Sequence, residues 1–280
     1  MFNFEEVVVP PSMTAVDIGA MLLDGQSDPM ARLSQLGQLR VIGFEPQLAE
    51  CEKLNALGRP GRRYLPYAIG NGERRNFYLT NTGMTSSLLR PNLEFARHFN
   101  NLADLMQVVA TPAIDTVRLD DVVEIRDEGC DLLKLDTQGS EAEILANATK
   151  TLEQCLIIQS EVEFVPLYVD QPLFAEVDQL LRSRGFMFHR FLHLSGRTYK
   201  PLMINNDPNI ALSQTLWSDV VYVPDLTRLD RLAPEALLKL AALLHEIYGS
   251  YDLCHVVLSA HDRQCRTSHS QRYLGLLARQ

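Results

Sequence analysis

The chain has 280 residues, is nearly half hydrophobic and carries a formal net charge of −9, which argues against nucleic acid as its main partner. Its five cysteines are scattered without a CxxC pair, so neither a disulfide framework nor a zinc knuckle is predicted, and a reducing cytoplasm is expected. The N-terminal segment lacks the pattern of a secretion signal, and no apolar run has the length of a membrane span.

Short apolar strands alternate with helical patterns from about residue 15 to residue 190, which predicts a doubly wound α/β fold with a parallel sheet. The expected strands are 15–18, 39–44, 64–69, 131–136 and 155–161. The expected helices between them are 48–57, 92–106 and 172–184. Two further strands, 75–80 and 113–118, are expected to extend one edge of this sheet.

The pattern changes after residue 186. Two strands, 186–194 and 217–223, are separated by a polar loop and predict an antiparallel closing pair. From residue 224 the chain reads as helical, with one helix starting at Pro234 and a second near 251–264. We therefore expect a main domain over 1–223 and a helical extension over 224–280, which either covers the sheet or joins two subunits in a homo-oligomer.

The segment LKLDTQGSEAEIL contains the most informative pattern, because an apolar strand is followed at once by a turn and a helix start. Ser140 and Glu143 have the spacing of a capping box. Asp136, Gln138 and Glu141 are then expected to gather beyond the carboxyl end of the strand. Open α/β sheets bind their ligands at that place.

Two earlier strand ends carry features of a nucleotide-type site. The sequence VDIGA places Asp17, Gly19 and Ala20 in a tight turn after the first strand, where a ligand can approach the backbone. Glu45 ends the second strand, where an acid can accept hydrogen bonds from ribose hydroxyls. Because the GxGxxG and Walker A patterns are both absent, S-adenosylmethionine fits these features better than NAD or a nucleoside triphosphate.

Seven motifs occur in the order seen in FkbM-type S-adenosylmethionine-dependent methyltransferases, and the chain resembles this family over about residues 14–195. They are VDIGA, GFEP, YAIGNGE, GMTSSL, TVRLDDV, LKLDTQGSEAEIL and IQSEVEFVPLYVDQPLF. The resemblance implies a class I methyltransferase sheet with a reversed last strand. It also implies O-methyl transfer to a hydroxyl of a small-molecule acceptor: a sugar, a glycolipid or a polyketide-like compound.

The resemblance also implies which residues contact the cofactor. They are Asp17, Gly19, Ala20, Phe44, Glu45, Pro46, Ala68, Ile69, Asp136 and Gln138. The family pattern usually continues VDIGANxG, whereas this chain has Met21 and Leu23 in place of the Asn and the Gly, with Asp24 and Gly25 following later. The loop after the first strand therefore differs from the family pattern.

Methyl transfer to a hydroxyl requires a group that takes up the hydroxyl proton. The candidates are Asp136, Glu161 and Glu141, with Glu163 further out. Asp136 and Glu161 are expected at the ends of adjacent strands, where the pair either raises the pKa of one member to make a base or holds a divalent metal, which is possible but not otherwise indicated.

Residues on the substrate side are less specific. Ser86 and Ser87 in the GMTSSL loop either form a turn or line the pocket, and Tyr168 either packs a loop or contacts substrate. A rival hypothesis is a catalytically inactive methyltransferase-like module that binds or assembles with a partner through its helical tail. The altered loop after VDIGA motivates this alternative.

Overall fold

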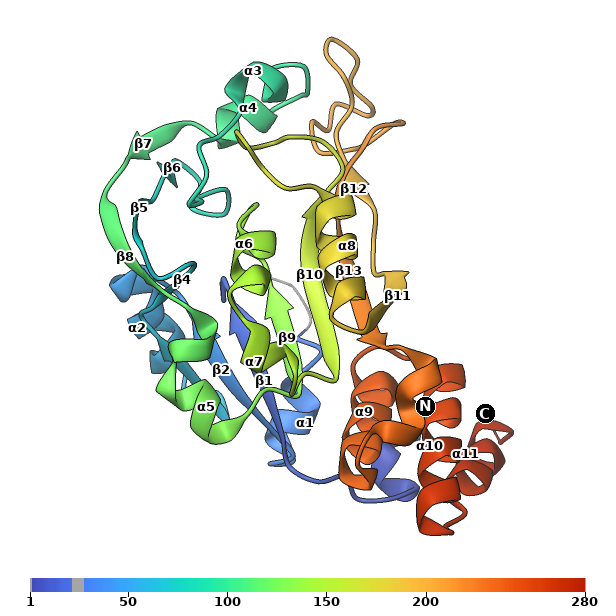
Figure 1. Cartoon of the computed structure of the whole chain (residues 1–280). Coiled ribbons are helices and arrows are strands. Elements are labelled where there is room, and N and C mark those ends of the chain that lie inside the picture. Colours follow the sequence, from blue (N-terminus) through green and yellow to red (C-terminus); the bar gives the residue numbers. More distant parts are fainter. Residues whose placement is uncertain (1, 22–27, 280) are drawn as a thin grey trace.

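The computed structural model describes residues 2–21 and 28–279, and its centre is a twisted sheet (Figure 1). The strand order is β11-β13-β10-β9-β1-β2-β3, with the short β12 (Ser195–Gly196) paired to β13. The other strands are β1 (Met13–Ile18), β2 (Leu39–Phe44), β3 (Arg62–Leu65), β9 (Leu132–Leu135), β10 (Ile157–Glu163), β11 (Phe186–Phe191) and β13 (Thr215–Pro224). Strand β13 is antiparallel to both neighbours, whereas β3, β2, β1, β9 and β10 are parallel. The doubly wound fold with a reversed last strand is confirmed.

Alternate residues of each strand supply the two faces of the sheet, as strand geometry requires. Val16 and Ile18 pack on one face among helices α5 to α8, whereas Met13 and Ala15 pack on the other face. The helices that pack on the sheet ahead of the C-terminal extension are α1 (Ala31–Gln35), α2 (Leu48–Ala56), α5 (Val123–Glu128), α6 (Glu141–Ala146), α7 (Thr149–Leu152) and α8 (Phe174–Ser183). Each face of the sheet therefore contributes to its own hydrophobic core.

The C-terminal extension covers the second face of the sheet. After a 3-10 turn (Leu226–Arg231) it forms α9 (Pro234–Glu246), α10 (Tyr251–Cys265) and α11 (His269–Leu277), the last of which the sequence pattern did not predict. Leu237 and Leu240 of α9 share a core cluster with Val41 of β2. Of the two roles expected for the extension, covering the sheet is the one observed. The boundary at residue 223 and self-association through these helices stay predictions.

The two ends of the described chain are joined by specific contacts. Phe4 in the N-terminal 3-10 turn (Phe4–Glu6) is buried, and its amide donates to the carboxylate of Glu246 (2.7 Å). The buried His245 lies 2.9 Å through Nε2 from the carbonyl of Phe2 and 2.9 Å through Nδ1 from the hydroxyl of Tyr273. The N-terminal segment is therefore bound to the end of α9 by hydrogen bonds.

Residues 77–110 form an irregular structure above the carboxyl edge of the sheet, and we call this segment the cap (Figure 1). The predicted helix 92–106 is wrong as one helix, because it is divided into α3 (Leu93–Ala96) and α4 (Leu102–Leu105) by Asn101 in a left-handed conformation with φ of 57°. The predicted strand 75–80 is likewise divided into β5 (Arg74–Asn76) and β6 (Leu79–Thr80), the latter pairing with β7 (Val108–Ala110).

The expected extension of the central sheet is also wrong. The predicted strand 64–69 ends at Leu65 before Pro66, which has no amide proton to donate, and it resumes as β4 (Ala68–Ile69). Strand β8 (Ala113–Val117) lies between β4 and β5 in a separate three-stranded sheet. These short strands therefore lie beside the central sheet and lead into the cap.

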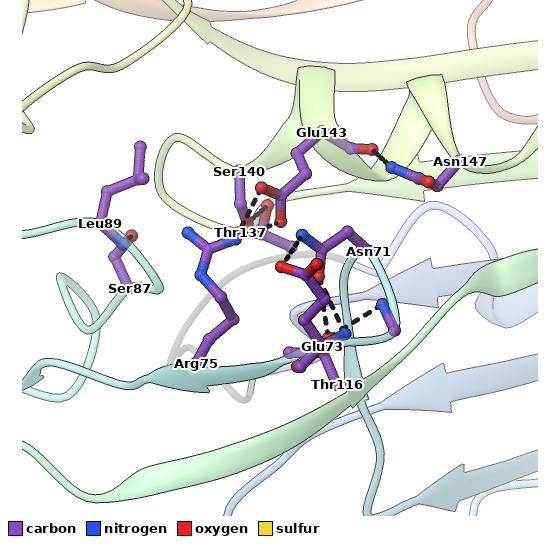
Figure 2. Close-up of polar contacts among 11 residues, drawn as sticks. Asn71, Glu73, Arg75, Ser87, Leu89, Thr116, Thr137, Ser140, Glu143 and Asn147 are labelled. Atoms are coloured by element: carbon purple, nitrogen blue, oxygen red, sulfur yellow. Dashed lines mark hydrogen bonds and ion pairs between the residues drawn. The ribbon is translucent and has the colours of Figure 1, made fainter.

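The predicted capping box at α6 is wrong. Ser140 is the N-cap residue, but its side chain donates to the hydroxyl of Thr137 (2.9 Å) instead of accepting from the helix. Glu143 pairs with Arg75 of β5 at 2.7 Å, so its carboxylate is engaged by a distant cation (Figure 2). This ion pair fastens the small three-stranded sheet to α6.

Across 2–21 and 28–279, none of the helices has the combination of length and apolar character that a membrane crossing needs.

Candidate active site

A cavity of about 680 Å³ opens at the carboxyl ends of β1, β2, β9 and β10, beneath the cap. This is the edge at which open α/β sheets bind ligands. The predicted site residues in its lining are Gly19, Phe44, Glu45, Pro46, Ala68, Ile69, Ser86, Asp136, Gln138, Glu161 and Tyr168. The fold thus brings most of the predicted residues to one place.

Gly19 permits the close approach of the central strands. Its φ is +80°, and a Cβ atom here would lie 1.9 Å from the carbonyl oxygen of Asp136. The amides of Gly19 and Ala20 both donate to the carbonyl of Phe44 at 3.1 Å. The turn after β1 is therefore held against the ends of β9 and β2 by contacts that only glycine allows.

Two predicted cofactor residues, Asp17 and Ala20, do not line the cavity. Asp17 pairs with Lys134 at 3.0 Å, and Lys134 rather than Asp17 lines the cavity. Ala20 is buried in a small hydrophobic cluster outside the cavity lining. Met21 lines the cavity and is 42% exposed, whereas Leu23, Asp24 and Gly25, where the loop departs from the family pattern, lie outside the described residues.

Lys134 keeps its charge despite its position in an apolar strand. Burial opposes the charged form, but the nearby carboxylates of Asp17, Asp136 and Asp219 outweigh this effect and raise the pKa of Lys134 above its ordinary value. The ammonium group therefore balances part of the negative charge at the strand ends.

Glu45 is positioned at the end of β2 as a buried acceptor. It is 4% exposed, and its Oε1 accepts a hydrogen bond from the amide of Gln47 (2.8 Å). Burial raises the pKa of Glu45, while the hydrogen bonds from Gln47 oppose the shift. Beside it, the rings of Phe44 and Tyr67 are stacked with centroids 6.1 Å apart, and Ile69 continues this apolar part of the lining.

Gln138 links two carboxylates, that of Asp136 directly after β9 and that of Glu161 on β10. Its amide nitrogen donates to Asp136 Oδ1 (3.0 Å) and to Glu161 Oε2 (2.5 Å). The hydroxyl of Tyr168 is 3.0 Å from the amide oxygen of Gln138 and 2.9 Å from the carbonyl of Thr85 in the cap. The amide therefore has defined neighbours on both its donor and its acceptor side.

The backbone of Gln138 is also unusual, since its φ of 59° is in the left-handed region that non-glycine residues seldom adopt. Ser87 holds this conformation by donating to the carbonyl of Gln138 at 2.8 Å. Ser87 is buried outside the cavity lining, whereas Ser86 lines the cavity. Of the two serines, only Ser86 is placed to touch a ligand.

Acidic side chains dominate the floor of the cavity. Burial raises the pKa of Glu161 well above its ordinary value, and the charges of Asp136 and Glu163 add to the shift. Glu163 is raised similarly, first by burial and then by Glu141. Asp219 on β13 faces Glu161 in the strand register, and burial followed by the charge of Asp136 raises its pKa too. These neighbours cannot all be ionised at neutral pH.

Glu141 organises the loop instead of facing the cavity. It is 2% exposed, and its two oxygens accept hydrogen bonds from the amides of Thr137 (2.7 Å) and Gly139 (2.9 Å). Burial raises the pKa of Glu141 to about 7, against the effect of these hydrogen bonds. The placement favours a supporting role over proton transfer for this candidate.

Several cavity residues were missed as site residues in the sequence. They are Lys134, His193, Ser195, Arg197, Trp217 and Asp219. A charged lysine inside the apolar run of β9 was an available signal, whereas the last four depend on how β12 pairs with β13. Within the part of the chain that the structure describes, no cluster of three or more His, Cys, Asp or Glu side chains is arranged to hold a metal.

Residues 17–188 match the family model described as the methyltransferase FkbM domain. The chain belongs to the FkbM methyltransferase family. The matched region runs from the end of β1 to the first part of β11, and it contains the turn after β1, the end of β2 and the Asp136–Gln138–Glu161 group. A comparison with proteins of curated function found no matching sequence.

Solved structures resemble this FkbM-family chain only distantly. Magnesium protoporphyrin IX methyltransferase from Synechocystis PCC 6803, with bound S-adenosylmethionine, is 11% identical with a TM-score of 0.40, covering 77% of this chain and 71% of that one. A protein of the NADB-Rossmann superfamily from Streptococcus agalactiae is 12% identical with a TM-score of 0.36, covering 98% and 95%.

Proposed function

We propose that this protein transfers a methyl group from S-adenosylmethionine to a hydroxyl of a sugar, with a glycolipid or a polyketide-like compound as the other acceptor classes. The proposal is supported by one observation above all. In a member of a methyltransferase family, Gly19, Glu45 and Asp136 line a single cavity at the carboxyl edge of the sheet. A hydroxyl and its proton acceptor can meet there out of bulk water.

The residues present fit the cofactor. Glu45 would accept hydrogen bonds from the ribose hydroxyls, and Ala68 and Ile69 would contact the adenine beside Phe44 and Pro46. Gly19, which lines the cavity at the turn after β1, would border the methionine part. The cofactor supplies an electrophilic methyl group on a sulfonium, and the acidic floor complements that positive charge.

The two carboxyl groups on either side of Gln138 suit a shared role in proton transfer. Burial and the charge of Asp136 favour the protonated form of Glu161, as the raised pKa of Glu161 indicates, so Glu161 is not available to take up a further proton. Asp136 lines the cavity and takes the proton of the acceptor hydroxyl. Gln138 keeps Asp136 oriented through its 3.0 Å hydrogen bond.

The base role is favoured over a metal site by the position of Gln138. A cation bridging Asp136 and Glu161 would have to replace the amide nitrogen that now donates to both carboxylates. Tyr168, close to the amide oxygen, supports this orientation of the amide group. Ser86 and Tyr168 face the acceptor side of the cavity in this proposal.

Calorimetric titration with S-adenosylhomocysteine, the demethylated product of the cofactor, tests the proposal. We expect micromolar binding, weakened by roughly 1–3 kcal/mol in Glu45→Ala, because hydrogen bonds to a charged acceptor are lost. Glu52→Ala, an exposed glutamate on α2, is the matched control and should bind normally. Equal affinity of the wild type and Glu45→Ala would remove Glu45 from the site. No binding to the wild type would instead favour an inactive binding or assembly module.

A further inference from the structure

Arg197 is a cation in the wall of the cavity opposite the cofactor residues. It follows β12 directly, and its guanidinium carbon lies 5.1 Å from the ring centroid of Trp217, which also lines the cavity. This stacking limits the directions in which the side chain can point. Arg197 is therefore a fixed positive charge at one end of a largely acidic cavity.

The hydrogen bonds of Arg197 leave one edge of its guanidinium group free. Nη1 donates to the carbonyls of Gly196 (2.8 Å) and Asn209 (3.4 Å), whereas Nε is buried without a partner. Over the described residues, no carboxylate lies within 4.0 Å of Arg197, and Nη2 makes no hydrogen bond. Nε and Nη2 share the edge that binds a carboxylate or a phosphate with two parallel hydrogen bonds.

Leaving a half-buried guanidinium without an anion is unfavourable. Burial lowers the pKa of Arg197, and the more distant charge of Asp207 offsets this only in part. A buried donor such as Nε normally has a hydrogen-bond partner, because desolvation without one costs free energy. An anionic ligand in the cavity would supply the missing negative charge beside the guanidinium group.

The strand register places this cation at a definite level relative to the acids. Glu161 pairs with Asp219, and two residues further out Glu163 pairs with Trp217, over which Arg197 stacks. Two strand residues correspond to roughly 7 Å. Arg197 therefore adds a positive charge at the level of Glu163, about one sugar ring away from the acids at the proposed site of methyl transfer.

We propose that the acceptor is an anionic sugar, such as a uronic acid or a sugar phosphate, whose carboxylate or phosphate is bound by Arg197. The inference rests on the proposed function and adds the charge of the substrate to it. In this arrangement, the anion contacts Nη2, and the ring extends past Trp217 toward Asp136. The hydroxyl to be methylated then lies on the far side of the ring from the anion.

Trp217 is the single tryptophan of the chain, so intrinsic fluorescence reports on this place directly. The probes are D-glucuronate, glucose 6-phosphate and neutral D-glucose, titrated at constant ionic strength with S-adenosylhomocysteine present. We expect a saturable change with at least one anionic sugar at concentrations at least tenfold below those needed for glucose. The response to each anion separates a carboxylate from a phosphate ligand.

Two variants connect the response to the guanidinium group. Arg197→Gln should lose the preference for anions, whereas Arg74→Gln, an exposed arginine on β5 outside the cavity lining, should keep it. Arg197→Lys retains the charge without the fork and should show a weaker preference. Circular dichroism and the thermal midpoint establish that each variant is folded.

Three results would overturn the proposal: an equal response to charged and neutral sugars, no response to any of them, or an undiminished anion preference in Arg197→Gln. All three are judged on protein that binds S-adenosylhomocysteine. If S-adenosylhomocysteine itself fails to bind, the proposed function fails first. Titration of the free protein with the same three sugars then still decides whether Arg197 selects anions.

Discussion

The two walls of the cavity are built in different ways. The lower wall consists of strand ends, where Gly19, Glu45 and Asp136 are held by backbone contacts across adjacent strands. The upper wall is the cap, whose helices and strands have two to four residues each and which packs on the sheet through a small cluster around Phe99 and Tyr168. In the proposed function, chemistry that needs fixed geometry is on the wall of strand ends, whereas the cap is the wall that tolerates variation.

The largest difference between the walls is expected in catalysis. Asp136→Asn should reduce turnover by roughly 10²- to 10⁴-fold, because the proton acceptor is lost, while S-adenosylhomocysteine binds within a few fold of normal. Single-turnover methyl transfer and calorimetry measure the two effects separately. Asp219→Asn, which changes another acid of the same wall, is the comparison. A larger loss in Asp219→Asn than in Asp136→Asn would transfer the base role to Asp219.

Glycine substitutions test the rigidity of each wall. Gly19→Ala should lower the free energy of unfolding by roughly 3 kcal/mol or more, since its Cβ would meet the carbonyl of Asp136 at 1.9 Å and its φ is +80°. Gly83→Ala in the cap has a φ of +69° with no atom within 4 Å, so only the backbone cost of about 1 kcal/mol remains. Equal losses in denaturant unfolding would contradict the contrast between the walls.

The buried acid of the lower wall predicts a pH dependence of stability. The pKa of Glu141 is about 7 in the folded protein against an ordinary value of 4.5, so folding favours its protonated form. This stabilisation is complete below about pH 4.5 and is lost as the pH rises toward and through 7, by up to roughly 3 kcal/mol. When urea unfolding is measured between pH 5 and 8, the free energy of unfolding of Glu141→Gln should change less with pH than that of the wild type. An identical change with pH in both proteins would mean that Glu141 titrates normally.

The smallest effect concerns the hydrogen bond that joins the walls. Ser87 follows the cap turn and donates to the carbonyl of Gln138 at 2.8 Å, while accepting from the amide of Leu89 at 2.9 Å. Ser87→Ala should cost about 1 kcal/mol of stability. Turnover should fall less than in Asp136→Asn, since Gln138 loses only a backbone support. Ser86→Ala, on the cavity side, should change the KM for the acceptor instead. If Ser86→Ala lowered stability and Ser87→Ala changed KM, the roles assigned to the two serines would be exchanged.

The same contrast explains how much could be predicted from the sequence. Strand ends followed by Asp136, Glu45 and Gly19 are local patterns, and the parallel sheet brings them together without further information. The cap was predicted poorly because its short elements depend on Asn101 and on tertiary pairing, which outweigh helical periodicity. Arg197 was missed because its position depends on the register between β12 and β13.

The capping box at Ser140 and Glu143 shows a different limit. The spacing was correct for a cap, but Arg75, more than sixty positions earlier, offers Glu143 a charged partner at 2.7 Å. A local pattern describes what a residue can do alone, and a distant ion pair decides what it does in the fold.

The fastening of Phe2 and Phe4 beneath α9 and α10 has a consequence for biosynthesis. The residues that hold this N-terminal segment, His245 and Glu246, are made more than 240 positions later. The first strand is therefore synthesised long before α9 and α10, which share a hydrophobic core with Met13 and Ala15, so this core is complete only when the final helices have been made. Truncations in the C-terminal extension are therefore expected to destabilise the N-terminal segment as well.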